Sequence, residues 1–205
     1  MKYFYFIMLA LFSINSWCDE TGKFYAGGGF AYAELSDGGM TDFQSMSNSE
    51  GAVHIFGGYQ FTPTLAAEIT IDGMGSYESE TSSSDIYNDY SAVSFAALGK
   101  MPLGQGFALY GQLGIGLTTI YQDVTAISGP YLITGTDSDT RFSTLWGAGF
   151  SYTFPAMKEL ELRLGMQQLN FSVDAYSIDK SGNLIRKNYD QDIRESYFAV
   201  AYRFY

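Results

Sequence analysis

The sequence predicts an all-β fold, an eight-stranded antiparallel transmembrane β-barrel with short turns at one end and long loops at the other. First, eight segments alternate apolar or aromatic residues with small or polar ones, which is the two-residue period of a strand with one apolar face. Second, the connections between these segments are alternately long and short. Third, no stretch after residue 18 is apolar over the ~20 residues that a membrane-spanning helix requires.

The eight strands are expected at residues 23–35, 50–61, 65–76, 90–101, 107–122, 140–154, 159–174 and 191–205. The last of them shows the alternation most clearly, with apolar residues at Phe198, Val200, Tyr202 and Phe204. As an exposed edge such a strand would favour aggregation, whereas in a closed barrel it has no free edge. Several segments exceed the ~9–11 residues that a tilted strand needs to cross the bilayer, and we expect the excess to project outward.

The connections carry the stronger signal. The expected short turns are 62–64, 102–106 and 155–158, and the expected long polar loops are 36–49, 78–89, 123–139 and 177–190. A soluble β-sandwich has no reason for this asymmetry, but an outer-membrane barrel has short periplasmic turns and long extracellular loops. The third and fourth loops keep a strand rhythm around Gly129-Pro130 and Ser181-Gly182-Asn183, so both are predicted to form hairpins.

Residues 195–205, which read ESYFAVAYRFY, resemble the terminal strand of small bacterial outer-membrane barrels of the OmpA/OmpX type. Tyr205 departs from that pattern, because it adds an aromatic residue in the opposite phase. The resemblance implies a barrel in the cell outer membrane of a Gram-negative bacterium, inserted by an assembly machinery that reads this strand. Since nothing follows Tyr205, we expect no peptidoglycan-binding module.

The resemblance also implies a network of salt bridges inside the barrel. Glu68 and Arg163 are its expected members, because their phase and their height above the short turns match, and Lys100, Arg141 and Glu161 are further candidates. An eight-stranded barrel is filled by its own side chains, and charges buried there must pair. The network is expected either to plug the lumen or to act as a gate that switches partners.

Residues 1–18 are predicted to be an export signal, with Lys2 as the positive end and an apolar run from Phe4 to Phe12. Cleavage is expected after Cys18, although an acylated Cys18 is the alternative. The barrel domain would then be residues 19–205, without a cysteine and therefore without a disulfide.

Composition and motifs exclude several function classes. The net charge of −11 argues against nucleic acid as a partner. His54 is the only histidine, its phase places it inside the barrel, and neither a GxSxG nor an HExxH motif occurs. Acidic loop residues such as Glu78 and Asp85 lack the spacing of a calcium loop. We therefore expect no catalytic, cofactor or metal residues, and no enzyme.

The loops are the expected working part of a structural or adhesion-like envelope protein. Lys180, Arg186 and Lys187 in the fourth loop are candidates for contact with lipopolysaccharide phosphates. The raised hairpins present an edge to which an extracellular protein partner could add a strand. The alternatives are a small-solute pore and an enzyme that modifies lipid A. We expect a monomer.

Overall fold

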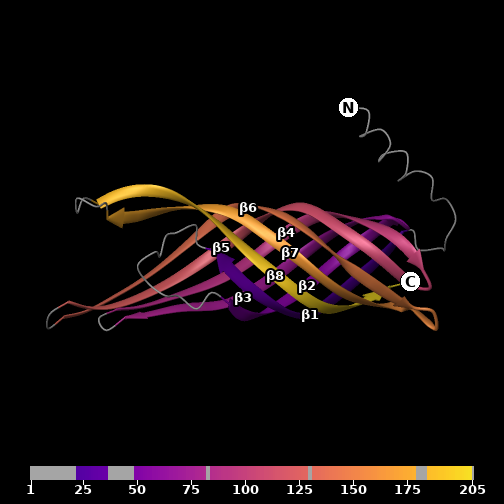
Figure 1. The fold of residues 1–205 in the computed structure, drawn as a ribbon, viewed down its shortest axis with the longest axis horizontal. Helices are drawn as coiled ribbons and strands as arrows, with labels where there is room; N and C mark the ends of the chain where they lie inside the picture. The colour runs from indigo at the N-terminus through magenta and orange to yellow at the C-terminus, as the bar shows by residue number, and fades with distance from the viewer. Residues whose placement is uncertain (1–21, 37–48, 82–83, 129–130, 179–183, 205) are drawn as a thin grey trace, which may run out of the picture.

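The computed structural model describes residues 22–36, 49–81, 84–128, 131–178 and 184–204, and these form one closed antiparallel barrel (Figure 1). Its strands are β1 (Lys23–Ser36), β2 (Ser49–Thr62), β3 (Leu65–Thr81), β4 (Ser84–Gly104), β5 (Phe107–Ser128), β6 (Tyr131–Phe154), β7 (Met157–Ile178) and β8 (Leu184–Arg203). The predicted fold class, strand number and strand order are confirmed. In this part of the chain no helix is long and apolar enough to cross a membrane. The predicted signal, residues 1–18, and Tyr205 lie outside the described residues.

The period of two residues separates an outer apolar surface from the lumen. Side chains such as Phe30 (78% exposed) and Leu113 (70% exposed) point outward, although their neighbours in the chain are buried or half-buried. Large apolar residues cover the outside of all eight strands in the same way. In water such a surface would be unstable, but in lipid it is the surface that the bilayer requires.

The short turns define the inner end of the barrel, and they fall at 63–64, 105–106 and 155–156 as the sequence predicts. One of them is the tight Gly104-Gln105-Gly106 turn, in which all three residues have positive φ values of 95°, 55° and 87°. Glycine accepts this conformation without strain. At the barrel seam, the Phe204 amide donates to the Phe24 carbonyl at 2.8 Å.

The outer connections are mostly strand rather than loop. The predicted hairpins around 129–130 and 181–183 are confirmed, since Ser128 pairs with Tyr131 and Ile178 pairs with Leu184. The expectation of a polar loop at 78–89 is wrong, because Glu78 pairs with Tyr87 and this segment forms a third hairpin. Because this segment is mostly polar, its sequence shows no alternation of apolar and polar residues. It forms strands because the adjacent part of β5 supplies backbone hydrogen-bond partners for β4 as far as Ser84. For the predicted loop 36–49, the structure describes only its two ends.

These hairpins rise above the barrel as two separate sheets. We call the raised parts of β3, β4, β5 and β6 the outer sheet, and residues 172–178 and 184–191 of β7 and β8 the outer ribbon. Pairing between β6 and β7 ends outward at Ser143 and Phe171, although β5 stays paired with β6 to the hairpin tip. In Figure 1 the tips of β3–β4 and β5–β6 lie together at the left, and the tip of the β7–β8 hairpin diverges from them.

Inward-facing glycines make room for large side chains in this narrow lumen. A Cβ on Gly165 would stand 2.2 Å from the Tyr110 hydroxyl, and one on Gly27 would stand 2.5 Å from the Phe56 ring. These glycines therefore let side chains of other strands pack in the lumen.

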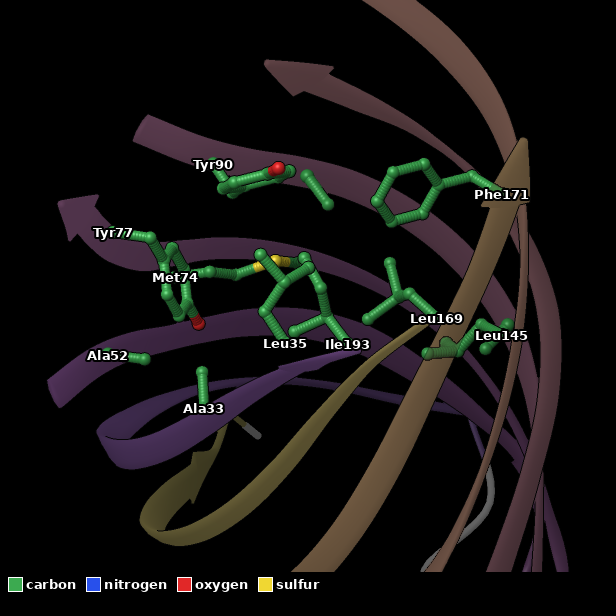
Figure 2. Close-up of a cluster of buried hydrophobic side chains, with 12 residues drawn as sticks. Ala33, Leu35, Ala52, Met74, Tyr77, Tyr90, Leu145, Leu169, Phe171 and Ile193 are labelled. Carbon is green, nitrogen blue, oxygen red and sulfur yellow. The ribbon is translucent and has the colours of Figure 1, made fainter. Parts of the chain in front are cut away.

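An apolar layer closes the outer part of the lumen (Figure 2). Its largest members are Leu35, Met74, Tyr77, Tyr90, Leu145, Leu169, Phe171 and Ile193, all of which are buried. They come from β1, β3, β4, β6, β7 and β8, so the layer crosses the whole barrel. Below it lie the buried charged residues of the lumen.

Candidate functional site

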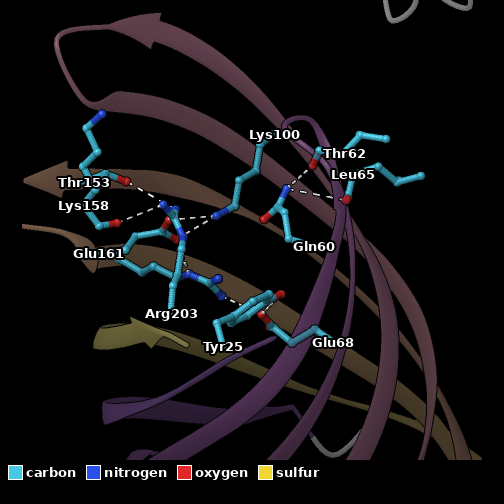
Figure 3. A network of polar contacts seen from close by, with 11 residues as sticks. Tyr25, Gln60, Thr62, Leu65, Glu68, Lys100, Thr153, Lys158, Glu161 and Arg203 are labelled. Atoms are coloured by element: carbon cyan, nitrogen blue, oxygen red, sulfur yellow. Dashed lines mark hydrogen bonds and ion pairs between the residues drawn. The ribbon is translucent and has the colours of Figure 1, made fainter. Parts of the chain in front are cut away.

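Charged side chains converge near the inner end of the lumen (Figure 3). We call this group the inner ion network; its members are Glu68, Lys100, Glu161, Arg163 and Arg203, each no more than 6% exposed. The Arg163 guanidinium lies 2.6 Å from Glu68 and 2.7 Å from Glu161. Lys100 donates to both oxygens of Glu161, at 2.9 and 2.8 Å, and Arg203 pairs with the same carboxylate. Three cations thus surround two carboxylates.

The structure brings together four of the five residues that were expected in this network. Arg141 is the exception, because it lies near the middle of β6, ten residues outward along the strand from Ser151, which pairs with Arg163. There Arg141 forms an ion pair with Asp139 at 2.5 Å. The inward phase of Arg203 was visible in the sequence, but its height beside Glu161 was not.

Aromatic rings enclose the central guanidinium. The Arg163 Cζ lies 4.4 Å from the Phe56 ring centroid, 5.1 Å from that of Tyr25 and 5.9 Å from that of Tyr110. The Tyr25 hydroxyl also donates to Glu68 at 2.9 Å. These contacts exclude water and fix the guanidinium in place, so they favour a fixed plug over a gate that changes partners.

A second polar group lies between the inner ion network and the apolar layer, and we call it the acidic cluster: His54, Asp72, Gln167 and Glu195. His54 Nδ1 lies 2.6 Å from Asp72 Oδ1, and the His54 ring stacks on Tyr197 with centroids 4.2 Å apart. The Gln167 amide donates to Asp72 at 3.1 Å and to Glu195 at 2.5 Å. The sequence placed His54, Asp72 and Glu195 in the lumen, but not in contact with one another.

Outside the barrel, a cavity of about 600 Å³ lies where β6 and β7 separate. We call it the β6–β7 cleft. It is lined by Arg141, Phe142, Thr144, Asn170, Phe171, Ser172, Asn188, Asp190, Gln191 and Asp192. Within it the Ser172 hydroxyl donates to Asp190 at 2.9 Å. Polar side chains, one exposed aromatic ring and two strand edges without a neighbouring strand among the described residues make it a candidate contact site at the outer end of the barrel.

The predicted contacts with lipopolysaccharide remain predictions. Lys180 lies outside the described residues, and for Arg186 and Lys187 the structure describes only the backbone of β8. Sequence reasoning missed Arg194, which lies on the outward face of β8 with its side chain 60% exposed. It donates to Gln168 at 3.2 Å and lies near the outer edge of the apolar surface, where lipid phosphates would lie.

Comparisons with known proteins agree with this architecture. The sequence model of the outer membrane protein beta-barrel domain family matches residues 4–204. The solved structure of Ail, the attachment invasion locus protein of Yersinia pestis, is 15% identical with a TM-score of 0.54, over 90% of this chain and 99% of Ail. OprG of Pseudomonas aeruginosa is 14% identical with a TM-score of 0.53, over 91% of this chain and 97% of OprG. The outer membrane protein AlkL is 13% identical with a TM-score of 0.55, over 94% and 95%. A comparison with curated protein sequences gives no significant match.

Proposed function

Because this chain belongs to the outer membrane protein beta-barrel family, we propose that it is an outer-membrane protein that works through its raised hairpins. Its contact site is the β6–β7 cleft, and its partner is an extended, basic polypeptide segment outside the cell. One observation carries the proposal: β6 and β7 are paired in the barrel but separate above it, which leaves two edges without a neighbouring strand among the described residues, beside a cavity.

The topology keeps these edges open. The only connection between β6 and β7 is the short turn at 155–156, at the inner end of the barrel, so no outer loop of this chain joins them. Residues 131–142 of β6 pair with β5 on one side, and residues 172–178 of β7 pair with β8 on one side. An unpaired edge offers backbone donors and acceptors to an added strand.

The acidic charge of the outer connections favours a basic partner. The segments 36–49, 78–89, 123–139 and 177–190 hold eleven Asp or Glu and three Lys or Arg. The cleft itself is lined by Asp190 and Asp192, whereas its one cation, Arg141, is already paired with Asp139. A basic segment would be attracted to this surface, and an acidic one repelled. Ail has been solved in complex with the heparin analogue sucrose octasulfate, which is an anion; the acidity of this chain supports a different partner.

Neither alternative function has comparable support. The apolar layer and the inner ion network fill the lumen at two levels, so a pore would require both to open. An enzyme acting on lipid A needs groups near the outer leaflet, but His54 is 1% exposed and lies below the apolar layer. Conductance in planar bilayers and lipid A mass spectrometry remain the direct tests of these two functions.

The experiment measures binding of a basic β-prone peptide to the folded protein in nanodiscs. In the test variant, Asn-Gly turns replace residues 118–141 and 172–190, which leaves the pairs Leu117–Phe142 and Phe171–Gln191 and removes both raised edges. In the control variant, an Asn-Gly turn replaces residues 78–87, which shortens the β3–β4 hairpin, and β5 separates this hairpin from β6. We expect the test variant to lose affinity about tenfold or more, and the control to keep it.

An acidic peptide of the same length serves as the ligand control. Heat-modifiable migration on gels shows that each variant is folded. Equal binding by the test variant and the wild type, or no binding by either, would overturn the proposal. Salt should weaken the binding, because the attraction is between exposed charges.

We further propose that basic residues of β8 hold the outer ribbon against lipopolysaccharide phosphates. Arg186 and Lys187 lie in its raised part, and Arg194 lies lower on the outward face. Charge reversal at all three positions should reduce binding to lipopolysaccharide vesicles, and leave binding to uncharged phosphatidylcholine vesicles unchanged.

A further inference from the structure

The acidic cluster of the lumen has the donors of a metal site. One ligand atom from each of His54, Asp72 and Glu195 lies within 4.8 Å of the other two. These residues are 1%, 0% and 0% exposed, so water does not stabilise their charges. They come from β2, β3 and β8, which are held in register by the closed barrel rather than by a loop.

Glu195 shows that the acidic cluster lacks a lysine or arginine partner among the described residues. Its Oε2 accepts from the Gln167 amide, but its Oε1 is buried without a hydrogen-bond partner among the described residues. The same neutral amide is shared with Asp72, and no Lys or Arg of the described chain pairs with either carboxylate. A buried carboxylate without a counter-charge costs several kcal/mol, so either a bound cation or a proton must neutralise the cluster.

The cations of the lumen lie elsewhere. The inner ion network holds three of them against two carboxylates. Glu68 and Asp72 are four residues apart on β3, which at ~3.3 Å per residue places them ~13 Å apart along the strand. Aromatic side chains of Phe56, Tyr110 and Tyr197 lie at heights between them, so the surplus charge below does not neutralise the acids above.

We propose that the acidic cluster binds one divalent transition-metal ion through His54, Asp72 and Glu195. An imidazole with two carboxylates is a donor set that suits zinc and manganese. With bonds of ~2.0–2.2 Å the ligand atoms of a tetrahedral zinc ion stand about 3.4 Å apart. The separations of up to 4.8 Å would therefore shorten, whereas His54 Nδ1 and Asp72 Oδ1, which lie 2.6 Å apart, would move apart by about 0.8 Å. This movement is within reach of side-chain rotation.

The surrounding residues orient these ligands as an outer shell does in metal proteins. Gln112 donates to the Gln167 carbonyl at 2.8 Å, and the Gln167 amide then holds both carboxylates. Tyr197 fixes the plane of the His54 ring by stacking, and its hydroxyl is bonded to that of Tyr110 at 2.8 Å. Such outer contacts reduce the reorganisation that metal binding requires.

The experiment measures metal content. The full chain is refolded from urea into detergent micelles with Zn²⁺, and in parallel with Mn²⁺, then passed over a desalting column in a weak chelator. Metal per protein is measured by inductively coupled plasma mass spectrometry. We expect about one ion per wild-type barrel, and a fall of at least about tenfold in Glu195→Gln and in His54→Gln. Glu34→Gln, which alters an exposed carboxylate at the outer end of β1, should match the wild type.

A second measurement separates a metal from a proton, which could also neutralise the cluster. The temperature at which the barrel unfolds in SDS should rise with Zn²⁺ or Mn²⁺ for the wild type and for Glu34→Gln, and should not change for Glu195→Gln. Glu195→Gln keeps the shape of the side chain and removes a buried charge, so it should fold. A folded wild type that retains no more of either metal than Glu195→Gln would overturn the proposal and assign a shared proton to the cluster.

Discussion

The inner ion network and the acidic cluster each hold two buried carboxylates, at two levels of one lumen, but the charges of these carboxylates are balanced in opposite ways. In the network, Glu161 forms ion pairs with Lys100, Arg163 and Arg203. In the cluster, Glu195 shares one amide with Asp72 and leaves an oxygen unbonded. A buried carboxylate that is paired with cations is compensated, whereas one without a cation costs free energy of folding. Replacing a carboxylate should therefore have opposite effects at the two levels.

The largest effect is expected for Glu161→Gln. It leaves three buried cations with only Glu68 to compensate them, so the free energy of unfolding should fall by ~5 kcal/mol. Urea titration in detergent, followed by tryptophan fluorescence, measures the loss. Glu159→Gln, two residues away on the same strand but only half-buried, is the matched control and should lie within ~0.5 kcal/mol of the wild type.

A smaller loss is expected for Glu68→Ala, because Arg163 keeps Glu161 as a partner. The same titration should show a loss of ~3 kcal/mol. Combining Glu68→Leu with Arg163→Met removes both charges, and should recover part of that loss while Lys100 and Arg203 still hold Glu161. If Glu68→Ala and Arg163→Met, each made alone, leave the free energy of unfolding unchanged, the Glu68–Arg163 contact contributes nothing to stability.

Gly165→Ala tests the aromatic residues that separate the two levels. The added Cβ would meet the Tyr110 hydroxyl at 2.2 Å and the Tyr197 ring at 2.8 Å, so one of the two side chains must move. Overpacking of this kind should cost ~2 kcal/mol. Gly99→Ala is the control, since a Cβ there meets nothing within 4 Å. Equal heat resistance of the two variants would show that the tyrosines are loosely held.

The smallest effect, with the opposite sign, is expected for Glu195→Gln in the presence of a chelator. Removing one of two close buried charges should stabilise the metal-free barrel by ~1 kcal/mol, whereas Glu161→Gln destabilises it. Urea titrations of both variants in the same buffer make the comparison direct. A loss of stability in Glu195→Gln would mean that the cluster is already charge-balanced without a metal.

Most of the barrel was predictable because its signals are local. The alternation assigns each side chain to lipid or lumen without knowledge of its neighbours, as Phe198 and Ala199 on β8 illustrate. The turn residues, Gly104 to Gly106 among them, mark the inner end in the same local way. The β3–β4 hairpin was missed because residues 78–89 are polar on both faces, so that strand formation there depends on the neighbouring strand.

The residue pattern was sufficient to predict the fold class, the strand order and which charged residues face the lumen. Which of these charges meet depends on the tertiary structure. Arg141 and Arg203 have the same inward phase, but Arg203 reaches Glu161 and Arg141 reaches Asp139. Their heights depend on how far each strand is staggered against the next, and this stagger is set by closure of the whole barrel rather than by any one strand. For the same reason, the meeting of His54, Asp72 and Glu195 from three strands could not be found from the sequence.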